Sequence, residues 1–137
     1  MKKIMVDMSA TIIHHGHIRL LKKAKEYGDV VVALTTDDGV KEAKGYYPEL
    51  EFNSRREILE SIKYVDKVVP CSWLITDDFL DEHNIDYLIH GSDNVNPIDQ
   101  SRLIIYDRTP GISASIIRGR VLKAVSDIYL GKESVEH

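Results

Sequence analysis

The sequence predicts an α/β fold, in which helices flank a central, mainly parallel sheet of about five strands. Short, continuous apolar runs such as 29–35 alternate with segments whose apolar residues recur at helical spacing. That run is apolar on both faces, which is typical of parallel strands covered by helices on either side. The chain has 137 residues, of which 43% are hydrophobic, and this suits a single domain over 1–137 with one sizeable core.

The chain begins with a strand predicted over 2–7 and a helix over 15–27, which Gly28 ends as a C-terminal cap. The second strand follows directly. Asp37 comes after its last residues, and its carboxylate suits either of two roles. It accepts hydrogen bonds from a ribose, or it caps a helical segment over 38–43. The residues alone leave both roles open.

A polar stretch over 41–52 interrupts the pattern and contains Gly45 and Pro48. It is predicted to be a mobile loop that carries Lys41 and Lys44. A lysine on a flexible stem meets a phosphate without needing a fixed geometry, so such a loop suits a phosphate site. Lys44 is the better candidate, whereas a solvated surface position explains Lys41.

The next helix is predicted to open at Ser54, because Ser54-Arg55-Arg56-Glu57 has the pattern of a capping box. Its apolar stripe consists of Ile58, Leu59, Ile62 and Val65. A strand over 67–69 follows, and Pro70 is expected to end it because proline donates no hydrogen bond to the ladder.

The remaining elements are a short helix over 77–83 and strands over 86–90 and 103–106. A turn over 108–111 leads to a final helix that Ser113 opens. The buried stripe of that helix is predicted to consist of Ile117, Val121, Val125 and Ile128.

Charge and cysteine content limit the classes of partner. Lys and Arg number 18 against 22 Asp and Glu, and the formal charge of −4 gives no general attraction to nucleic acid or to an anionic membrane. Cys71 is the only cysteine, which excludes an internal disulfide and suits a reducing compartment. The sequence has no signal-peptide pattern and no apolar run of roughly 20 residues. We therefore expect a cytoplasmic protein without a nucleic-acid or membrane partner.

The stretch from Met8 to His17 lies between the first strand and the first helix. In a doubly wound sheet such a turn lies at the carboxyl edge, where the following helix directs unpaired N–H groups at an anion. His14 and His17 add directional donors, and Gly16 lets the backbone approach closely. Zinc is a poor alternative, because the other histidines form no second ligand pair and no cysteine cluster exists.

A second motif follows near the end of the chain, Arg108-Thr109-Pro110-Gly111-Ile112-Ser113-Ala114-Ser115-Ile116-Ile117-Arg118. Together with His14-x-Gly16-His17 it resembles the cytidylyltransferase-like branch of the nucleotidyltransferases, and most of all the glycerol-3-phosphate cytidylyltransferases. The resemblance implies a Rossmann-like fold, a homodimer, and transfer of CMP from CTP to a small phosphorylated alcohol with release of pyrophosphate. Magnesium, which phosphates and water largely hold, is expected to arrive with the nucleotide rather than in a protein metal site.

The resemblance also implies roles for individual residues. The catalytic set is His14, His17, Lys44, Arg108 and Ser113. The residues expected to contact nucleotide or substrate are Met8, Ser9, Ala10, Gly16, Asp37, Arg55, Gly91, Ser92, Asp93, Thr109, Gly111, Ile112, Ser115 and Arg118. Gly91-Ser92-Asp93 resembles the family's Gly-Asp-Asp, which reads the cytosine edge, while Asn94 replaces an aromatic residue and Thr11 replaces an aspartate.

Nucleotidyl transfer requires charge neutralisation, alignment of the attacking oxygen and a stabilised pyrophosphate, but no covalent nucleophile. An acceptor that is a phosphate monoester ionises for a second time near pH ~6, so it attacks without a general base. Glycerol 3-phosphate is the first acceptor to expect. The alternatives are an aminoethylphosphonate-type cytidylyltransferase, because Met8-Ser9-Ala10 resembles that group, and an adenylyltransferase acting on a sugar phosphate or FMN. Outside the enzymes stands a nucleotide-binding module without turnover.

Overall fold

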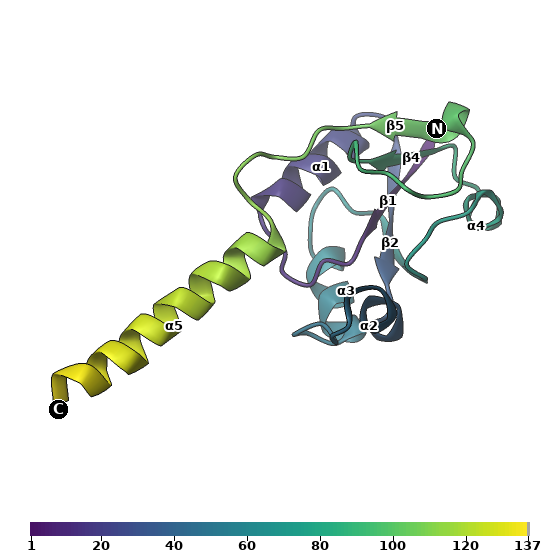
Figure 1. Ribbon diagram of the computed structural model, residues 1–137. Helices are drawn as coiled ribbons and strands as arrows, with labels where there is room; N and C mark the ends of the chain where they lie inside the picture. The colour runs from purple at the N-terminus through teal and green to yellow at the C-terminus, as the bar shows by residue number, and fades with distance from the viewer. Residues whose placement is uncertain (137) are drawn as a thin grey trace.

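The computed structural model describes residues 1–136, with side chains to residue 129. Its sheet consists of β1 (Lys3–Met8), β2 (Asp29–Thr35), β3 (Lys67–Cys71), β4 (Tyr87–His90) and β5 (Leu103–Ile105). The helices are α1 (His15–Lys25), α2 (Asp37–Lys44), α3 (Phe52–Glu60), α4 (Asp77–Glu82) and α5 (Ala114–Glu136), with a 3₁₀ turn over Gln100–Arg102. All neighbouring strands pair in parallel (Figure 1), which confirms the predicted α/β class.

The strand order is β3-β2-β1-β4-β5. The chain therefore builds outward from β1 through β2 to β3 and then crosses back to place β4 on the other side of β1. Met5 of β1 pairs with Val31 on one side and Leu88 on the other. Since the connections after β1 and β4 leave the sheet in opposite directions, a crevice is expected at their carboxyl ends.

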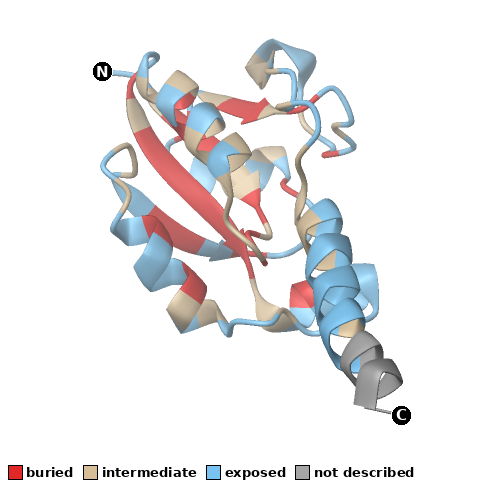
Figure 2. Ribbon diagram, turned by 90° about the vertical axis from the view of Figure 1, so that its left-hand side faces the viewer, coloured by how far each residue is buried: buried red, intermediate tan, exposed pale blue. Residues whose placement is uncertain are grey.

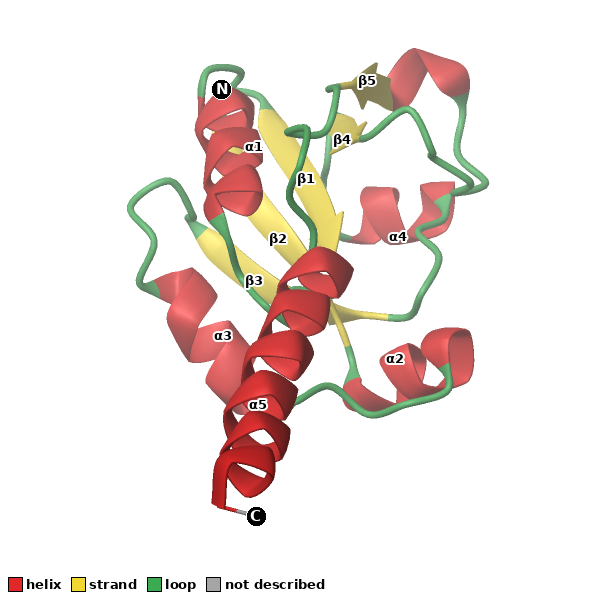
Figure 3. Ribbon diagram, turned by 60° about the vertical axis from the view of Figure 1, so that its left-hand side comes forward, coloured by secondary structure: helices red, strands yellow, loops and turns green. Residues whose placement is uncertain are grey.

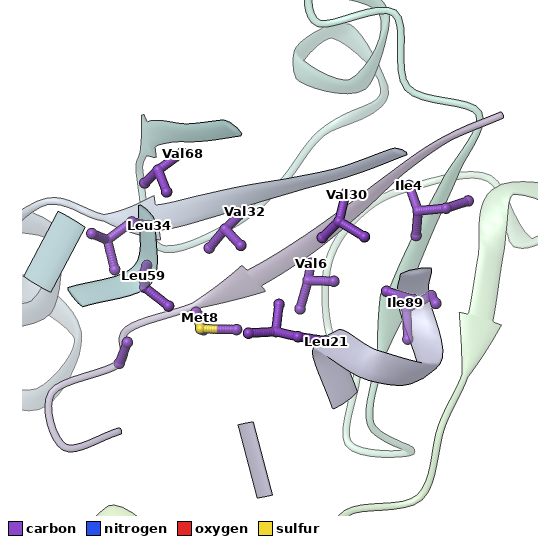
Figure 4. Close-up of a cluster of buried hydrophobic side chains, with 12 residues drawn as sticks. Ile4, Val6, Met8, Leu21, Val30, Val32, Leu34, Leu59, Val68 and Ile89 are labelled. Carbon is purple, nitrogen blue, oxygen red and sulfur yellow. The ribbon is translucent and has the colours of Figure 1, made fainter. Parts of the chain in front are cut away.

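The core has two layers, one on each face of the sheet. On the first face Val6 and Val32 pack with Leu21 of α1 and Leu59 of α3 (Figure 4). On the second face Met5 and other residues of the opposite pleat pack against Leu80 of α4 and its neighbours. Figure 3 shows α1 and α3 on one side of the sheet and α4 on the other. Both strand faces are covered, which explains why the apolar runs show no alternation.

The final helix differs from the prediction. Its apolar stripe is exposed, with Val121 at 55%, Val125 at 43% and Ile128 at 62% of their free surface, while Ile117 is half-buried. Beyond its first turns α5 leaves the body of the protein, and Figure 2 shows most of the helix up to residue 129 in the exposed colour. A stripe at helical spacing shows which face of a helix is apolar but not what covers it. Among the described residues no helix has both the length and the apolar character needed to cross a membrane.

Two predicted boundaries also shift. The third helix begins at Phe52 rather than Ser54, with Glu51 as an N-cap that makes no side-chain hydrogen bond, so the capping box does not form. Strand β3 continues through Pro70, which lies opposite Leu34. Because β3 is an edge strand, the missing N–H of an exposed proline leaves no ladder bond unmade.

Arg55 on α3 is fully buried and ties together four segments of the chain. Its guanidinium donates to the carbonyl oxygens of Ser9 at 2.6 Å, Thr35 at 2.9 Å and Leu50 at 3.1 Å. Its Nη2 pairs with Oδ1 of Asp37 at 2.6 Å. A buried guanidinium is tolerated only when its donors are satisfied, so these acceptors hold the carboxyl ends of β1 and β2 in fixed positions.

We predict that Arg55→Leu lowers the free energy of unfolding by about 3–5 kcal/mol, because it removes the guanidinium from the carboxylate of Asp37 and from the carbonyls of Ser9 and Thr35. The neighbouring Arg56→Leu is the matched control. Arg56 forms only an exposed pair with Glu60 at 3.0 Å, so its loss costs about 0.5 kcal/mol or less. Denaturant unfolding of both variants measures the difference. Equal losses would show that the buried position of Arg55 contributes nothing.

Candidate active site

A pocket of about 410 Å³ lies at the carboxyl ends of β1 and β4, at the crevice expected from the strand order. The turn after β1, the start of α1, the loop after β4 and the turn before α5 line it. It brings together most of the predicted site residues, namely Met8, Ser9, Ala10, His14, Gly16, His17, Lys44, Gly91, Asp93, Arg108, Thr109, Ile112, Ser113 and Ser115. Asp37, Arg55, Ser92, Gly111 and Arg118 do not line it.

The two motif histidines form the N-terminal cap of α1. Nδ1 of His14 accepts from the Gly16 N–H at 3.0 Å, and Nδ1 of His17 accepts from the His14 N–H at 3.1 Å. Because each Nδ1 accepts, the proton of each neutral ring lies on Nε2. A side chain at position 16 would come within 2.9 Å of the His14 ring, so this turn requires glycine. The cap thus leaves each ring with one free donor, Nε2–H.

Both histidines are uncharged at neutral pH. Burial, together with the nearby His14 and Arg108, lowers the pKa of His17 to about 4. Burial, His15 and Arg108 also lower the pKa of His14. Two neutral imidazoles offer hydrogen bonds to phosphate oxygens without adding net charge to the site.

A second helix N-terminus meets the same pocket from the turn before α5. Oγ of Ser113 accepts from the Ile116 N–H at 3.1 Å and so caps the helix. Gly111 makes the preceding turn with a φ of 77°, a conformation that favours glycine. Arg108 pairs with both oxygens of Asp93, with Nη2 to Oδ2 at 2.9 Å and Nε to Oδ1 at 3.3 Å. The two motifs therefore place two helix N-termini at one cavity.

The two lysines lie on a helix and not on the predicted mobile loop, because α2 continues to Lys44. Gly45 then ends the helix in the left-handed conformation, with a φ of 82°. Nζ of Lys44 lies 5.6 Å from the centre of the Trp73 ring, and both residues line the pocket. Nζ of Lys41 instead donates to the carbonyl of Gly45 at 2.8 Å, away from the site.

Asp37 does not cap α2, so one of its two predicted roles is wrong. Thr36 caps α2, since its Oγ1 accepts from the Gly39 N–H at 3.1 Å. The carboxylate of Asp37 faces Arg55 and accepts from the Phe52 N–H at 3.2 Å. Asp37 and Arg55 thus neutralise each other outside the pocket lining, and the contact of either with nucleotide stays a prediction.

Arg118 also lies apart from the main pocket. Its Nη2 pairs with Glu49 at 2.7 Å, its Nη1 donates to the Tyr46 hydroxyl at 3.1 Å, and its guanidinium lies 5.1 Å from the centre of the Tyr46 ring. These contacts fasten the first turns of α5 to the loop after α2. Ser92 is exposed in the turn after β4, outside the pocket lining.

Three polar residues of the pocket were missed by the sequence reasoning. Asp7 is the second-last residue of β1 and His90 is the last residue of β4, and Nδ1 of His90 lies 2.7 Å from Oδ1 of Asp7. Asn96 donates to Oδ2 of Asp7 at 3.2 Å. A polar residue at the carboxyl end of an apolar strand was the available signal for the first two. Their contact depends on the adjacency of β1 and β4, which the sequence does not show.

Thr11 lines the pocket and is buried, and its Oγ1 has no hydrogen-bond partner among the described residues. No group of three or more His, Cys, Asp or Glu residues in the described chain is arranged to hold a metal ion. The two carboxylates of the pocket, Asp7 and Asp93, already face His90 and Arg108. The protein residues therefore do not fit a resident metal.

Comparison with known proteins agrees with this geometry. A family model described as cytidylyltransferase-like matches residues 9–120. A glycerol-3-phosphate cytidylyltransferase of Bacillus subtilis is 36% identical, covering 88% of this chain and 98% of that protein. The Staphylococcus aureus enzyme of the same name is 35% identical, covering 86% and 93%.

More distant matches include a longer cytidylyltransferase and a solved structure of the same fold. An ethanolamine-phosphate cytidylyltransferase of Mus musculus is 30% identical over 88% of this chain, but this match covers only 32% of that longer protein. A lipopolysaccharide core biosynthesis protein from Thermoplasma volcanium superposes with a TM-score of 0.63 over 77% of this chain and 97% of its own, at 21% identity, and so supports the fold alone. With most of its length matched by the family model and by close relatives, this chain belongs to the cytidylyltransferase-like family.

Proposed function

We propose that this protein is a cytoplasmic enzyme that transfers CMP from CTP to a small phosphorylated alcohol, with glycerol 3-phosphate as the first acceptor to test. One observation carries the proposal: the His14–His17 turn and the Arg108–Ser113 turn meet at one pocket, each with a helix N-terminus that favours phosphate. The names of the two bacterial relatives support the choice of nucleotide and acceptor.

The chemistry follows from the donors present. The acceptor phosphate attacks the α-phosphorus of the nucleotide, and pyrophosphate leaves. The Nε2–H groups of His14 and His17 donate to oxygens on which negative charge increases in the transition state, and Lys44 and Arg108 supply the positive charge. The remaining cationic character comes from the N–H groups at the starts of α1 and α5. No general base is needed for an acceptor that is already ionised.

Magnesium belongs to the proposal only as an ion carried by the triphosphate. The described residues hold no metal cluster, and phosphate oxygens with water suffice as its ligands. Base recognition is proposed for the turn after β4, where Gly91 and Asp93 line the pocket and Ser92 lies beside them. Asp93 is held there by Arg108, so the two turns support each other.

Pyrophosphate release in the presence of CTP and a panel of acceptors tests the function. The panel contains glycerol 3-phosphate, phosphoethanolamine, aminoethylphosphonate, a sugar phosphate and FMN, each with all four nucleoside triphosphates. Acceptor-dependent release with CTP supports the proposal. Binding of CTP without release under any acceptor would instead indicate a nucleotide-binding module without turnover.

We predict that His17→Ala lowers kcat about 10²-fold or more while CTP affinity falls less, because a donor aimed at developing charge acts mainly in the transition state. His15→Ala is the matched control, since His15 is exposed and does not line the pocket. Steady-state kinetics and CTP titration measure both effects. If binding and turnover fell equally, His17 would have a ground-state role.

The preference for CTP over ATP is expected to be real but modest. Asn94 replaces the aromatic residue of the resembled family, and selection by shape in an apolar pocket gives only roughly 10- to 200-fold. Competition between the two nucleotides in one turnover assay measures the ratio. A preference for ATP would overturn the cytidylyl assignment and leave nucleotidyl transfer intact.

We further propose a homodimer in which a second copy covers the exposed stripe of α5. Light scattering at micromolar concentration is expected to give the dimer mass. Replacing Val121 and Val125 together by glutamine is expected to shift the mass to that of the monomer, whereas Lys123→Gln is expected to leave the dimer intact because Lys123 pairs with Asp127 of its own helix. A monomer mass for the unmodified protein would contradict this proposal.

A further inference from the structure

A polar pair formed by Asp7 and His90 lies in the pocket lining, at the carboxyl ends of two neighbouring strands. Their side chains are only 10% and 18% exposed. The proposed transfer chemistry makes no use of either residue. A largely enclosed carboxylate and imidazole in contact with each other therefore require a separate explanation.

The contacts around the pair fix its orientation. Oδ1 of Asp7 faces Nδ1 of His90 at 2.7 Å, and Oδ2 accepts from the side-chain amide of Asn96 at 3.2 Å. Asn96 is itself held, because its Oδ1 accepts from the Ile75 N–H at 2.8 Å. Both carboxylate oxygens of Asp7 are thus occupied, and the His90 ring has one orientation in which Nδ1 donates to Asp7.

That orientation leaves Nε2 of His90 as a donor without a hydrogen-bond partner among the described residues. The nearest carboxylate oxygen, Oδ1 of Asp93, lies 3.7 Å away, beyond hydrogen-bond distance. Asp93 is instead engaged by Arg108. Because His90 lines the pocket, its Nε2–H is available to a bound molecule.

Electrostatics keep this ring protonated at higher pH than usual. Burial alone would lower the pKa of His90, but the hydrogen bond and charge of Asp7, helped by Asp93, outweigh burial and the opposing charge of Arg108 and raise it. A protonated ring donates from both nitrogens at once. These are the charged groups that the strand β1, the loop after β4 and the turn before α5 present to the ring.

The pocket contains no free carboxylate. Asp7 and Asp93 are the acidic residues of its lining, and each already faces a cation, His90 in one case and Arg108 in the other. An ammonium group on an acceptor would find no unpaired carboxylate among these residues and would lie near the cations His90 and Arg108. An uncharged hydroxyl would accept a hydrogen bond from Nε2–H, so the arrangement favours one tail chemistry and disfavours the other.

We propose that His90, positioned by Asp7 and Asn96, donates from Nε2 to a hydroxyl on the tail of the acceptor and thereby selects hydroxylated, uncharged tails over ammonium tails. This inference rests on the proposed function, since it assigns the acceptor class to the same site. It makes His90 a specificity-determining residue, and Asp7 and Asn96 positioning residues that act through it.

Steady-state kinetics with glycerol 3-phosphate and with phosphoethanolamine test the inference. His90→Leu removes the donor and is expected to raise the KM for glycerol 3-phosphate about 10- to 100-fold, the equivalent of losing a hydrogen bond from a charged group. The KM for CTP is expected to change little. His90→Gln keeps an uncharged donor and is expected to recover part of the loss, which a purely structural role would not produce. His83→Gln, outside the pocket, is the control.

A pH profile supplies the second readout. In the unmodified enzyme the KM for glycerol 3-phosphate is expected to rise as pH increases through the raised pKa of His90, because the ring loses its proton. Asp7→Asn removes the stabilising charge, so the rise is expected at lower pH. This variant also serves if His90→Leu fails to fold.

The outcomes are distinguishable from failure of the proposed function. Absence of any CTP-dependent pyrophosphate release with the unmodified protein refutes the function itself. If His90→Leu and Asp7→Asn both turn over with an unchanged KM for glycerol 3-phosphate, the role of His90 is refuted and the proposed function stands. An equal or greater loss of CTP affinity would assign His90 to the nucleotide, and faster use of phosphoethanolamine than of glycerol 3-phosphate would refute the proposed selectivity.

Discussion

The buried guanidinium of Arg55 is the constraint on which the shape of the site depends. It lies at the carboxyl edge of the sheet, outside the pocket. All of its acceptors must be present, since an unsatisfied buried charge would cost several kcal/mol. Its hydrogen bond to the Ser9 carbonyl fixes the peptide that precedes Ala10. The φ angle of Ala10 is 47°, which is unusual for a residue other than glycine. The phosphate turn is therefore shaped from behind by a residue that does not line the pocket.

The charged groups of the pocket are arranged so that few unpaired negative charges face a polyanionic ligand. The motif histidines are neutral, and the two carboxylates are paired with cations, so little uncompensated negative charge opposes a triphosphate. The attraction comes from Lys44, from two helix N-termini and, in part, from Arg108, whose charge Asp93 already offsets; the fold places all of them at the pocket before a ligand arrives. Such preorganisation is what electrostatic stabilisation of a transition state requires. It also explains how an acidic chain can hold an anion.

Much of the fold was predictable from sequence, because parallel strands buried on both faces leave continuous apolar runs, and Gly16 with its flanking histidines marks the first turn. The features that were missed depend on tertiary contacts. Arg55 is predicted to contact the ligand from its match to an arginine of the resembled family, and the sequence does not show that its guanidinium is fully buried. Asp7 and His90 meet only because β4 returns beside β1. The exposed stripe of α5 was read as core, since periodicity defines an apolar face without defining its partner.

The central claim is that the two motif turns form one nucleotide site. Amide chemical shifts recorded during titration of the protein with CTP test it most directly, because each of the two turns contains a glycine whose amide signal can be followed separately. The account predicts concerted, saturable shifts at Gly16, Gly91 and Gly111, with little change at Gly28, which precedes β2 at the opposite edge of the sheet. Shifts confined to the shallow surface around Tyr46 and Arg118, with Gly16 and Gly111 unmoved, would contradict it.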